Sequence, residues 1–308
     1  MRVVVALGGN ALLRRGEAMT AENQRRNVQV AATALAELER DHQIVVAHGN
    51  GPQVGLLALQ ALAYTEVAAY PLDVLGAESS GMIGYLIEQE LMNALPAGTP
   101  CGTLLTQIEV GRDDPAFRAP SKPIGPVYEA AVMERLRAEY GWDFVEEKAG
   151  QWRRVVPSPR PRKLLQEGVI RSLVESGVVV ICTGGGGIPV IRGADGRLEG
   201  IEGVIDKDRA ASLLAREIGA DAFLMLTDVA AVFADWGTER ERALGQVEPA
   251  TLEAMDFAAG SMGPKVDSAC EFVRATGGIA GIGRLEDAAA ILAGATGTRV
   301  TPAAGATT

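Results

Sequence analysis

Short apolar runs rich in β-branched residues, each closed by a glycine turn, recur along the chain. The runs and their turns are 3–7 with Gly8-Gly9, 44–47 with Gly49-Asn50-Gly51, and 178–181 with 184–187. Continuous apolar runs of this length are typical of strands buried on both faces of a parallel sheet. Glycine lets the backbone approach a ligand and point N–H groups at it, and helix N-termini after the turns would add partial positive charge. Together the three turns predict an anion-binding crevice at the carboxyl ends of the strands.

Helical patterns alternate with these runs. Thr20 to about Glu39 has an amphipathic helix pattern, with Thr20 in the predicted N-cap region. The other expected helices are Gln53–Tyr64, Asp73–Asn93, Asp206–Ile218, Pro264–Thr276 and Leu285–Leu292. The other expected strands are Cys101–Ile108, Phe223–Leu226 and Gly297–Val300, with a hairpin joining 190–192 to 198–200. This alternation predicts an α/β fold with a parallel sheet covered on both faces.

The pattern changes between about 111 and 162, where prolines are frequent and aromatic and charged residues are interspersed. We expect one domain over 1–308 from which this segment departs, either as a surface insertion without a role or as a small protruding subdomain. A subdomain that acts as a lid is favoured, because Lys122 lies in a rigid loop framed by prolines.

Composition and charge narrow the function classes. The chain has 308 residues, 22% of them charged, and a net charge of −10. An acidic body argues against general affinity for nucleic acid or an anionic membrane surface, because phosphate groups in such partners need clustered Lys and Arg. The densest basic stretch, 153–163, contains prolines and no aromatic series, so we expect it to be a solvated surface segment. No apolar stretch approaches the roughly 20 residues of a membrane span.

Other common sites are absent from the sequence. Cys101, Cys182 and Cys270 stand apart, without a CxxC or Cys/His cluster, so we expect no zinc site. Few cysteines suit a reducing compartment, and no secretory leader pattern opens the chain, which together predict a cytoplasmic protein. The chain contains neither a Walker A motif nor the protein-kinase signature motifs.

Three lysines could serve the predicted crevice. Lys207 and Lys265 each lie at the start of a predicted helix, and Lys122 lies in the insertion. Phosphoryl transfer needs cations around the transferred oxygens and a magnesium ion, and lysine is a mobile point charge suited to a phosphate that changes partner. Any one of these lysines would more often be a solvated surface charge. Together with the glycine turns, the three favour phosphoryl transfer.

Neighbouring polar residues each allow two interpretations. Asp208 could hold the lysines by charge pairing and reach magnesium through water, or simply favour a helix N-terminus. His48 could donate to an anion, although a single histidine at a strand end is more often a structural hydrogen-bonder. The amides of Asn10 and Asn50 could bind substrate oxygen or only satisfy turn geometry.

These motifs, in their order across nearly the whole chain, resemble those of the carbamate kinases in the amino-acid kinase superfamily. The matching stretches are Ala6-Leu-Gly-Gly-Asn-Ala-Leu12, His48-Gly-Asn-Gly-Pro-Gln-Val-Gly55, Lys122-Pro-Ile-Gly-Pro126, Gly184-Gly-Gly-Gly-Ile-Pro-Val190, Ile205-Asp-Lys-Asp208, Leu226-Thr-Asp228 and Gly260-Ser-Met-Gly-Pro-Lys265. The stretches that begin at His48 and Lys122 are specific to carbamate kinases within the superfamily. The Gly8-Gly9 turn alone would indicate only the superfamily.

The resemblance implies a three-layer αβα sandwich around a mainly parallel sheet, with a small protruding subdomain. It also implies reversible transfer of phosphate between carbamoyl phosphate and ADP, giving ATP and carbamate, with Mg²⁺ bound together with the nucleotide. Such enzymes usually recover ATP from carbamoyl phosphate derived from arginine or purines, and they are typically homodimers. Since carbamoyl phosphate is already activated and the motifs contain no evident nucleophile, we expect direct in-line transfer without a phosphoenzyme.

Roles for individual residues follow from the resemblance. Lys122 would close over carbamoyl phosphate, Lys207 and Lys265 would contact phosphate near the nucleotide, and Asp208 would organise them. The residues that would hold the transferred phosphate and carbamate are Gly8, Gly9, Asn10, Gly49, Asn50 and Gly51. Those that would border the nucleotide are Gly184, Gly185, Thr227, Asp228, Met262 and Lys265. No protein residue is expected to be a metal ligand.

Three alternatives stay open at the level of sequence. A sibling kinase that phosphorylates an amino-acid carboxylate is disfavoured by the Lys122 loop. A nucleotide-binding module without catalysis would not require a lid for a second substrate. A nicotinamide-dependent oxidoreductase rests only on the pattern Gly49-x-Gly51-x-x-x-Gly55, which is weak evidence by itself.

Overall fold

The computed structural model describes residues 1–14, 16–64, 66–258 and 260–303. Its centre is an eight-stranded sheet in which all neighbouring strands are parallel except the pair β16 and β17. In spatial order the strands are β15 (Gln246–Val247), β17 (Thr298–Val300), β16 (Ile279–Arg284), β12 (Ala222–Thr227), β1 (Arg2–Leu7), β2 (Gln43–His48), β9 (Val179–Ile181) and β3 (Cys101–Thr103). The turns that follow β12, β1, β2 and β9 therefore emerge at one edge of the sheet.

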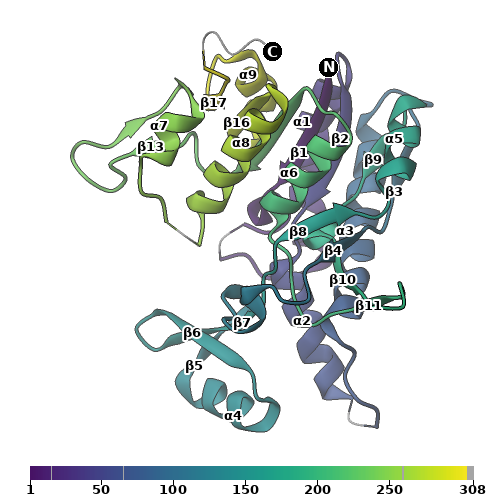
Figure 1. Ribbon diagram of the computed structural model, residues 1–308, viewed down its shortest axis with the longest axis vertical. Coiled ribbons are helices and arrows are strands. Elements are labelled where there is room, and N and C mark those ends of the chain that lie inside the picture. The colour runs from purple at the N-terminus through teal and green to yellow at the C-terminus, as the bar shows by residue number, and fades with distance from the viewer. Residues whose placement is uncertain (15, 65, 259, 304–308) are drawn as a thin grey trace.

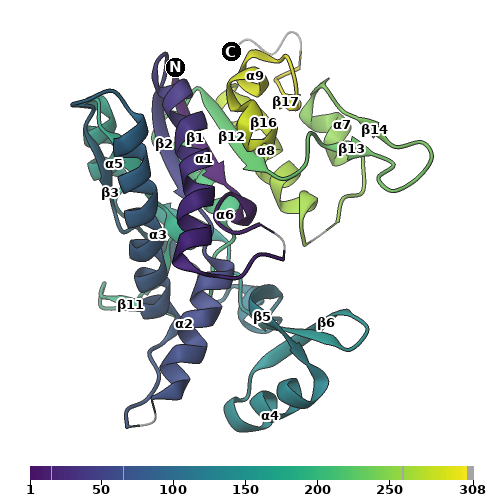
Figure 2. The ribbon, with the colours of Figure 1, turned by 180° about the vertical axis from the view of Figure 1, so that it is seen from behind.

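Helices cover both faces of this sheet (Figures 1 and 2). One face carries α5 (Glu167–Glu175), α6 (Lys207–Glu217) and α8 (Met262–Thr276), and the other carries α1 (Ala21–Glu39), α3 (Leu72–Ala94) and α9 (Ala288–Ala293). Successive residues of β1 enter the two cores in turn, Val4 on the first face and Val5 on the second. Burial on both sides explains why the strand is apolar from Val3 to Leu7. The predicted αβα sandwich around a mainly parallel sheet is confirmed.

A second sheet packs beside α3. Its strands, in spatial order, are β11 (Leu198–Gly200), β10 (Ile188–Arg192), β4 (Gln107–Val110) and β8 (Pro161–Leu164). The predicted hairpin is confirmed as β10 and β11. The single strand predicted over Cys101–Ile108 is wrong, because β3 belongs to the central sheet and β4 to the second. Between them the Thr106 hydroxyl accepts a hydrogen bond from the Thr183 N–H (3.0 Å), which ties the chain to the end of β9 instead of extending the strand.

Residues 122–156 form a small subdomain that protrudes from the body (Figures 1 and 2). Its elements are β5 (Lys122–Glu129), α4 (Ala130–Tyr140), β6 (Asp143–Lys148) and β7 (Gln151–Val156), with strand order β5-β7-β6. Tyr128, Met133 and Leu136 form its own apolar cluster, against which aromatic rings pack. The strand β8, at the end of the interval 111–162, instead pairs with β4 in the second sheet.

The basic stretch 153–163 differs from its prediction as a solvated segment. The guanidinium of Arg154 lies 3.7 Å from the centre of the Trp142 ring, and burial lowers the pKa of Arg154 to about 10. Within this stretch, the exposed basic residues are Arg160, Arg162 and Lys163. The first half of the stretch is therefore part of the packing of the subdomain.

The remaining elements are short apart from α2. They are α2 (Gly51–Ala63), α7 (Pro249–Glu253), β13 (Phe233–Ala234), β14 (Arg242–Ala243) and the 3-10 turns η1 (Gly9–Ala11), η2 (Pro115–Phe117), η3 (Gly184–Gly186) and η4 (Leu285–Asp287). The helix predicted from Thr20 is confirmed, and the Thr20 hydroxyl accepts from the N–H of Asn23 at 3.2 Å. Within the described residues, no helix is long and apolar enough to cross a membrane.

The expectation of a helix N-terminus after every glycine turn is wrong for two of the three turns. The turn at Gly49–Gly51 leads into the long helix α2, whereas η1 and η3 are single turns. At η3, Gly185 and the two glycines after it have positive φ, which a right-handed helix does not allow. The contribution of helix dipoles to an anion site is therefore smaller than the sequence predicts.

Candidate active site

The turn after β1 opens onto the carboxyl edge of the sheet. Leu7 pairs with Leu226 of β12 on one side and with His48 of β2 on the other. The N–H of Gly8 donates to the carbonyl of Leu226 (2.9 Å), and a Cβ at Gly8 would lie 2.8 Å from that oxygen, so the position requires glycine. A Cβ at Gly9 would meet no atom within 4 Å. The backbone of Gly9 thus faces open space that a ligand can enter.

The turn after β2 makes room for a lysine. A Cβ at Gly49 would lie 3.2 Å from Cδ of Lys207, so the missing side chain lets the lysine stem pass. The amide of Asn50 is buried and donates to the Ser79 hydroxyl at 2.8 Å. Gly51 begins α2 and lies near the subdomain, since its Cβ would come within 3.9 Å of the Pro123 carbonyl.

The glycine loop after β9 is buried and packs against two neighbours. A Cβ at Gly185 would lie 2.2 Å from Nδ2 of Asn50, and one at Gly186 would lie 2.3 Å from the carbonyl oxygen of Ile205. The loop therefore contacts both the turn after β2 and the segment that leads into α6. Its small residues allow the start of α6 to approach the sheet edge closely.

Three lysines converge on two aspartates at the start of α6. The Nζ atoms of Lys207 and Lys265 lie 2.5 and 3.0 Å from the two carboxylate oxygens of Asp208, and Nζ of Lys122 lies 2.5 Å from Oδ2 of Asp206. Lys207 comes from α6, Lys265 from α8 and Lys122 from β5 of the subdomain. The structure thus brings together all four residues predicted to be catalytic.

Burial and charge pairing act against each other in this cluster. Burial alone would raise the pKa of Asp208, but Lys207 and Lys265 outweigh it and hold the pKa below its usual range. For Lys207, burial prevails and lowers the pKa in spite of the adjacent Asp208, whereas for Lys265 the aspartate outweighs burial and the pKa is raised. Three lysines facing two aspartates leave one positive charge in excess, which suits an anionic ligand.

His48 supports the turn from inside the protein. It is 1% exposed, and burial lowers the pKa of its imidazole to about 4. The ring is therefore neutral near pH 7, and Nδ1–H donates to the carbonyl of Gly49 at 3.0 Å. A Cβ at Gly184 would lie 2.7 Å from Nε2, so the ring also contacts the loop after β9.

The residues predicted to border the nucleotide fall into two groups. Thr227 ends β12, and its hydroxyl donates to Asp228 Oδ1 at 3.2 Å. Met262 begins α8, one turn before Lys265, and is half-buried. The buried pair Gly184-Gly185 lies at the end of β9, three strand spacings or about 14 Å from the end of β12. The structure does not bring this pair to the other group.

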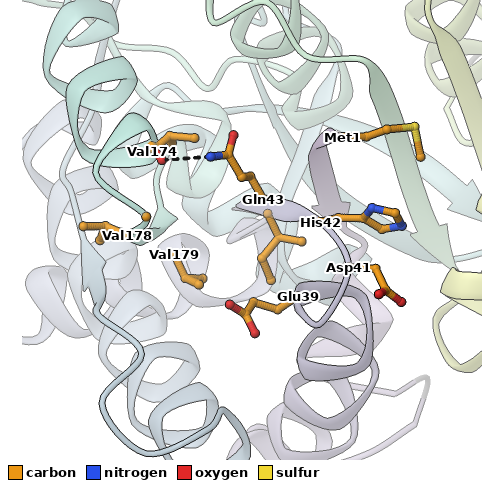
Figure 3. Close-up of a pocket in the computed structure, with 10 residues that line it drawn as sticks. Met1, Glu39, Asp41, His42, Gln43, Val174, Val178 and Val179 are labelled. Carbon is orange, nitrogen blue, oxygen red and sulfur yellow. Dashed lines mark hydrogen bonds between the residues drawn. The ribbon is translucent and has the colours of Figure 1, made fainter.

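A pocket of about 300 Å³ lies elsewhere (Figure 3). Its lining residues are Met1, Glu39, Asp41, His42, Gln43, Ile44, Val174 and 177–179. These residues surround the starts of β1, β2 and β9, where Nε2 of Gln43 donates to the carbonyl of Val174 at 3.5 Å. The pocket is at the amino edge of the sheet, opposite the lysine cluster, and is separate from the candidate site.

Sequence reasoning missed Asp206. It placed this residue at the helix start without a role at the site, although an aspartate immediately before a helix is a visible N-cap signal. Its partner Lys122 is 84 residues away, and no local pattern reports that contact. The backbone of Asn10 lies in η1, and its side chain is outside what the structure describes.

The fold and the cluster define a class of protein that transfers phosphoryl groups. A family model described as "Amino acid kinase family" matches residues 1–282 of the chain. The chain therefore belongs to the amino acid kinase family and is a kinase, that is, a phosphotransferase.

Individual relatives narrow this class. The carbamate kinase of Haemophilus influenzae is 52% identical over 301 residues, which cover 98% of this chain and 97% of that protein. The carbamate kinase of Escherichia coli K12 is 54% identical over 297 residues, covering 96% of this chain and 98% of that protein. The solved structure of carbamate kinase from Giardia lamblia bound to AMP-PNP has a TM-score of 0.89 and 40% identity, covering 98% of each chain. Within the family, the chain belongs to the carbamate kinases.

Proposed function

We propose that the protein catalyses reversible phosphoryl transfer between carbamoyl phosphate and ADP, giving ATP and carbamate. The observation that carries the proposal is the convergence of Lys122, Lys207 and Lys265 at the carboxyl edge of the sheet. Their ammonium groups are held in place before any ligand arrives, which is how preorganised charges stabilise a transferring phosphoryl group. The substrate in this proposal is inferred from the relatives, which are named carbamate kinases.

Within this proposal, each part of the site has a task. The backbone N–H of Gly9 and the ammonium groups of Lys207 and Lys265 bind the transferred phosphoryl group between the two substrates. Lys122 reaches the carbamoyl phosphate from the subdomain. Thr227, Asp228 and Met262 border the nucleotide. Nucleotide binding as such is supported by the Giardia lamblia relative, whose solved structure is bound to AMP-PNP.

Transfer is direct and in line, without a phosphoenzyme. This step is supported by the state of two side chains at the sheet edge that could be nucleophiles, His48 and Cys182. Burial lowers the pKa of His48 to about 4 and encloses its ring, while burial raises the pKa of the Cys182 thiol well above its usual range. The carbamate or ADP oxygen therefore attacks phosphorus itself, and the lysines stabilise the charge that spreads over the equatorial oxygens.

Mg²⁺ enters in this proposal with the nucleotide. Among the described residues, no group of three acidic, histidine or cysteine side chains could hold a metal ion. Both oxygens of Asp208 are paired with lysines, and those of Asp206 are paired with Lys122 and with backbone N–H groups. Phosphate oxygens and water are therefore the ligands that fit, as is usual for Mg²⁺ bound to a nucleotide. When bound, the ion neutralises phosphate charge.

The test of the proposed function is ATP formation from ADP, Mg²⁺ and carbamoyl phosphate by wild type, Lys122→Ala and Lys148→Ala. Lys148 is an exposed lysine of the same subdomain and serves as the matched control. We expect rapid ATP formation by wild type and Lys148→Ala, and a decrease of kcat/KM by about 100- to 1,000-fold in Lys122→Ala.

Two other results would change the proposal. Full activity in Lys122→Ala would keep the kinase and remove the role of the subdomain lysine. A folded wild type that binds nucleotide but forms no ATP would point to another acceptor carboxylate or to a binding module.

We also propose a homodimer in the cytoplasm. The exposed face of α3 carries Val74, Met82, Tyr85 and Met92 at helical spacing, with exposed fractions of 38, 38, 55 and 62%. A single apolar helix face can pair with its own copy about a two-fold axis, since such an interface needs no second surface. Tyr85→Glu combined with Met92→Glu should shift the mass measured by light scattering from dimer to monomer.

The three free cysteines support a reducing compartment.

A further inference from the structure

The carboxylate of Asp206 makes two different kinds of contact. Its Oδ1 accepts from the backbone N–H groups of Asp208 (2.9 Å) and Arg209 (3.3 Å), which caps the N-terminus of α6. Its Oδ2 accepts from Nζ of Lys122 at 2.5 Å. One side chain therefore joins the helix that carries Lys207 to the subdomain that carries Lys122.

The environment makes this junction strong. The side chains of Asp206 and Lys122 are 13 and 28% exposed, so solvent screens their attraction less than at the surface. Burial alone would raise the pKa of Asp206, but Lys122 and Lys207 outweigh it and hold the pKa well below its usual range. The carboxylate is thus ionised throughout the working pH range.

The backbone around Asp206 is also fixed from the other side. A Cβ at Gly186 would lie only 2.3 Å from the carbonyl oxygen of Ile205, so the segment before α6 packs tightly against the glycine loop. A carboxylate on a fixed backbone can hold the ammonium group of Lys122 in one position, although the lysine side chain otherwise has many rotamers. Lys122 lies at the first residue of β5, where the subdomain joins the body.

We infer that Asp206 is a positioning residue: it holds the Lys122 ammonium at the N-terminus of α6, beside the Lys207–Asp208–Lys265 cluster. This inference rests on the proposed function. Asp206 acts through Lys122 and not on the substrate. Its loss therefore harms turnover only while Lys122 is present.

Asp206→Asn separates this role from helix capping. Asparagine caps a helix about as well as aspartate, so the variant keeps the contact to the α6 N–H groups and loses the charge toward Lys122. The variants to compare are wild type, Asp206→Asn, Lys122→Ala and the double variant. Thr20→Ala, which removes the cap of the distant helix α1, is the control for capping alone.

We expect kcat for ATP formation to fall by about tenfold in Asp206→Asn. In the Lys122→Ala background the same substitution should change kcat by less than about twofold, because the partner is already gone. KM for carbamoyl phosphate should stay equal or fall in Asp206→Asn, since the cluster gains one positive charge. Thr20→Ala should keep kcat and KM and lower only Tm.

An equal loss of kcat in both backgrounds, or wild-type kcat in Asp206→Asn, would overturn the inference. Thermal unfolding of the same four proteins gives a readout that does not depend on activity. The sum of the Tm decreases of the two single variants should exceed the Tm decrease of the double variant. Strictly additive decreases would contradict an ion pair between Asp206 and Lys122. If wild type forms no ATP while the Tm values remain non-additive, the proposed function fails and the ion pair stands.

Discussion

At the scale of single residues, Asp206 and Asp208 have different roles because their carboxylate oxygens bind different partners. Asp208 faces into the protein, is 4% exposed at its side chain and binds two lysines, one per oxygen. Asp206 caps the helix with one oxygen and reaches the subdomain with the other. Removing the charge of Asp208 leaves two largely buried ammonium groups without a counter-charge, which is strongly unfavourable.

Asp208→Asn should leave Lys207 and Lys265 short of a counter-charge. We expect a loss of about 3 kcal/mol in the free energy of unfolding and a decrease of kcat by about 100-fold. Asp208 raises the pKa of Lys207, which burial already lowers, so its removal lowers that pKa further. Since a lysine loses its charge as pH rises through its pKa, the alkaline decline of kcat should move to lower pH. A pH profile with an unmoved alkaline limb would contradict this role.

Gly8 and Gly9 should respond differently to alanine. Gly9→Ala meets no protein atom, so Tm should be unchanged, while the new methyl group enters the space proposed for the ligand and lowers kcat/KM by about 100-fold. Gly8→Ala would place Cβ 2.8 Å from the Leu226 carbonyl and should lower the free energy of unfolding by about 1–3 kcal/mol. Unchanged kinetics in Gly9→Ala would mean that no ligand approaches this backbone.

At the scale of elements, the position of the subdomain depends on one close backbone contact. A Cβ at Gly55 of α2 would lie 2.0 Å from Cα of Gly125 in β5, which has a φ of +73°. Around this contact, Val54, Ile124 and Val156 share an apolar cluster that joins α2 to the base of the subdomain. The third glycine of the pattern that resembles a dinucleotide-binding motif therefore serves packing of α2 against β5 of the subdomain.

Gly55→Ala should push β5 away from α2. Because Lys122 is the first residue of β5, we expect its ammonium to move from Asp206 and kcat/KM for carbamoyl phosphate to fall by about 100-fold. Nucleotide affinity, measured by titration calorimetry, should be retained because the residues proposed to border the nucleotide lie at the end of β12 and on α8. Gly76→Ala in α3, where a Cβ meets nothing within 4 Å, is the control and should keep full activity. Wild-type kinetics in Gly55→Ala would show that the subdomain tolerates the shift.

At the scale of the whole molecule, folding buries a neutral histidine at the centre of the site edge. His48 has a pKa of about 4 in the folded protein against an ordinary value of 6.5, with burial as the main cause. Above pH 6.5 the ring is neutral in both states and does not affect stability. Between pH 6.5 and 4 the unfolded chain binds a proton that the folded protein does not, so the free energy of unfolding falls as pH falls.

The expected size of this effect is about 3 kcal/mol between pH 7 and pH 4. Denaturant unfolding of wild type and His48→Gln at pH 7, 5.5 and 4.5 measures it. Glutamine cannot be protonated, so the variant should be less stable at pH 7 and should lose much less stability toward acid. Parallel pH dependences in the two proteins would exclude His48 as the cause.

Much of the fold could be predicted because local patterns record local burial. The runs at 3–7, 44–47 and 178–181 are apolar at every position since both faces of the central sheet are covered. The cap at Thr20 and the start of α6 at Lys207, which Asp206 caps, are set by contacts within one turn, which the sequence contains in full. For the same reason, the sequence by itself determined the strand-end turns and the lysines that belong to the site.

Only the tertiary structure decided which of these groups meet. The break between β3 and β4 follows from two sheets that compete for one segment, and the need for glycine at Gly55 follows from a strand 70 positions further along. The pairing of Lys122 with Asp206 arises because chain topology places the subdomain over the start of α6. An ion pair between residues 84 positions apart depends on the path of the backbone between them. Residue type and spacing alone do not predict that path.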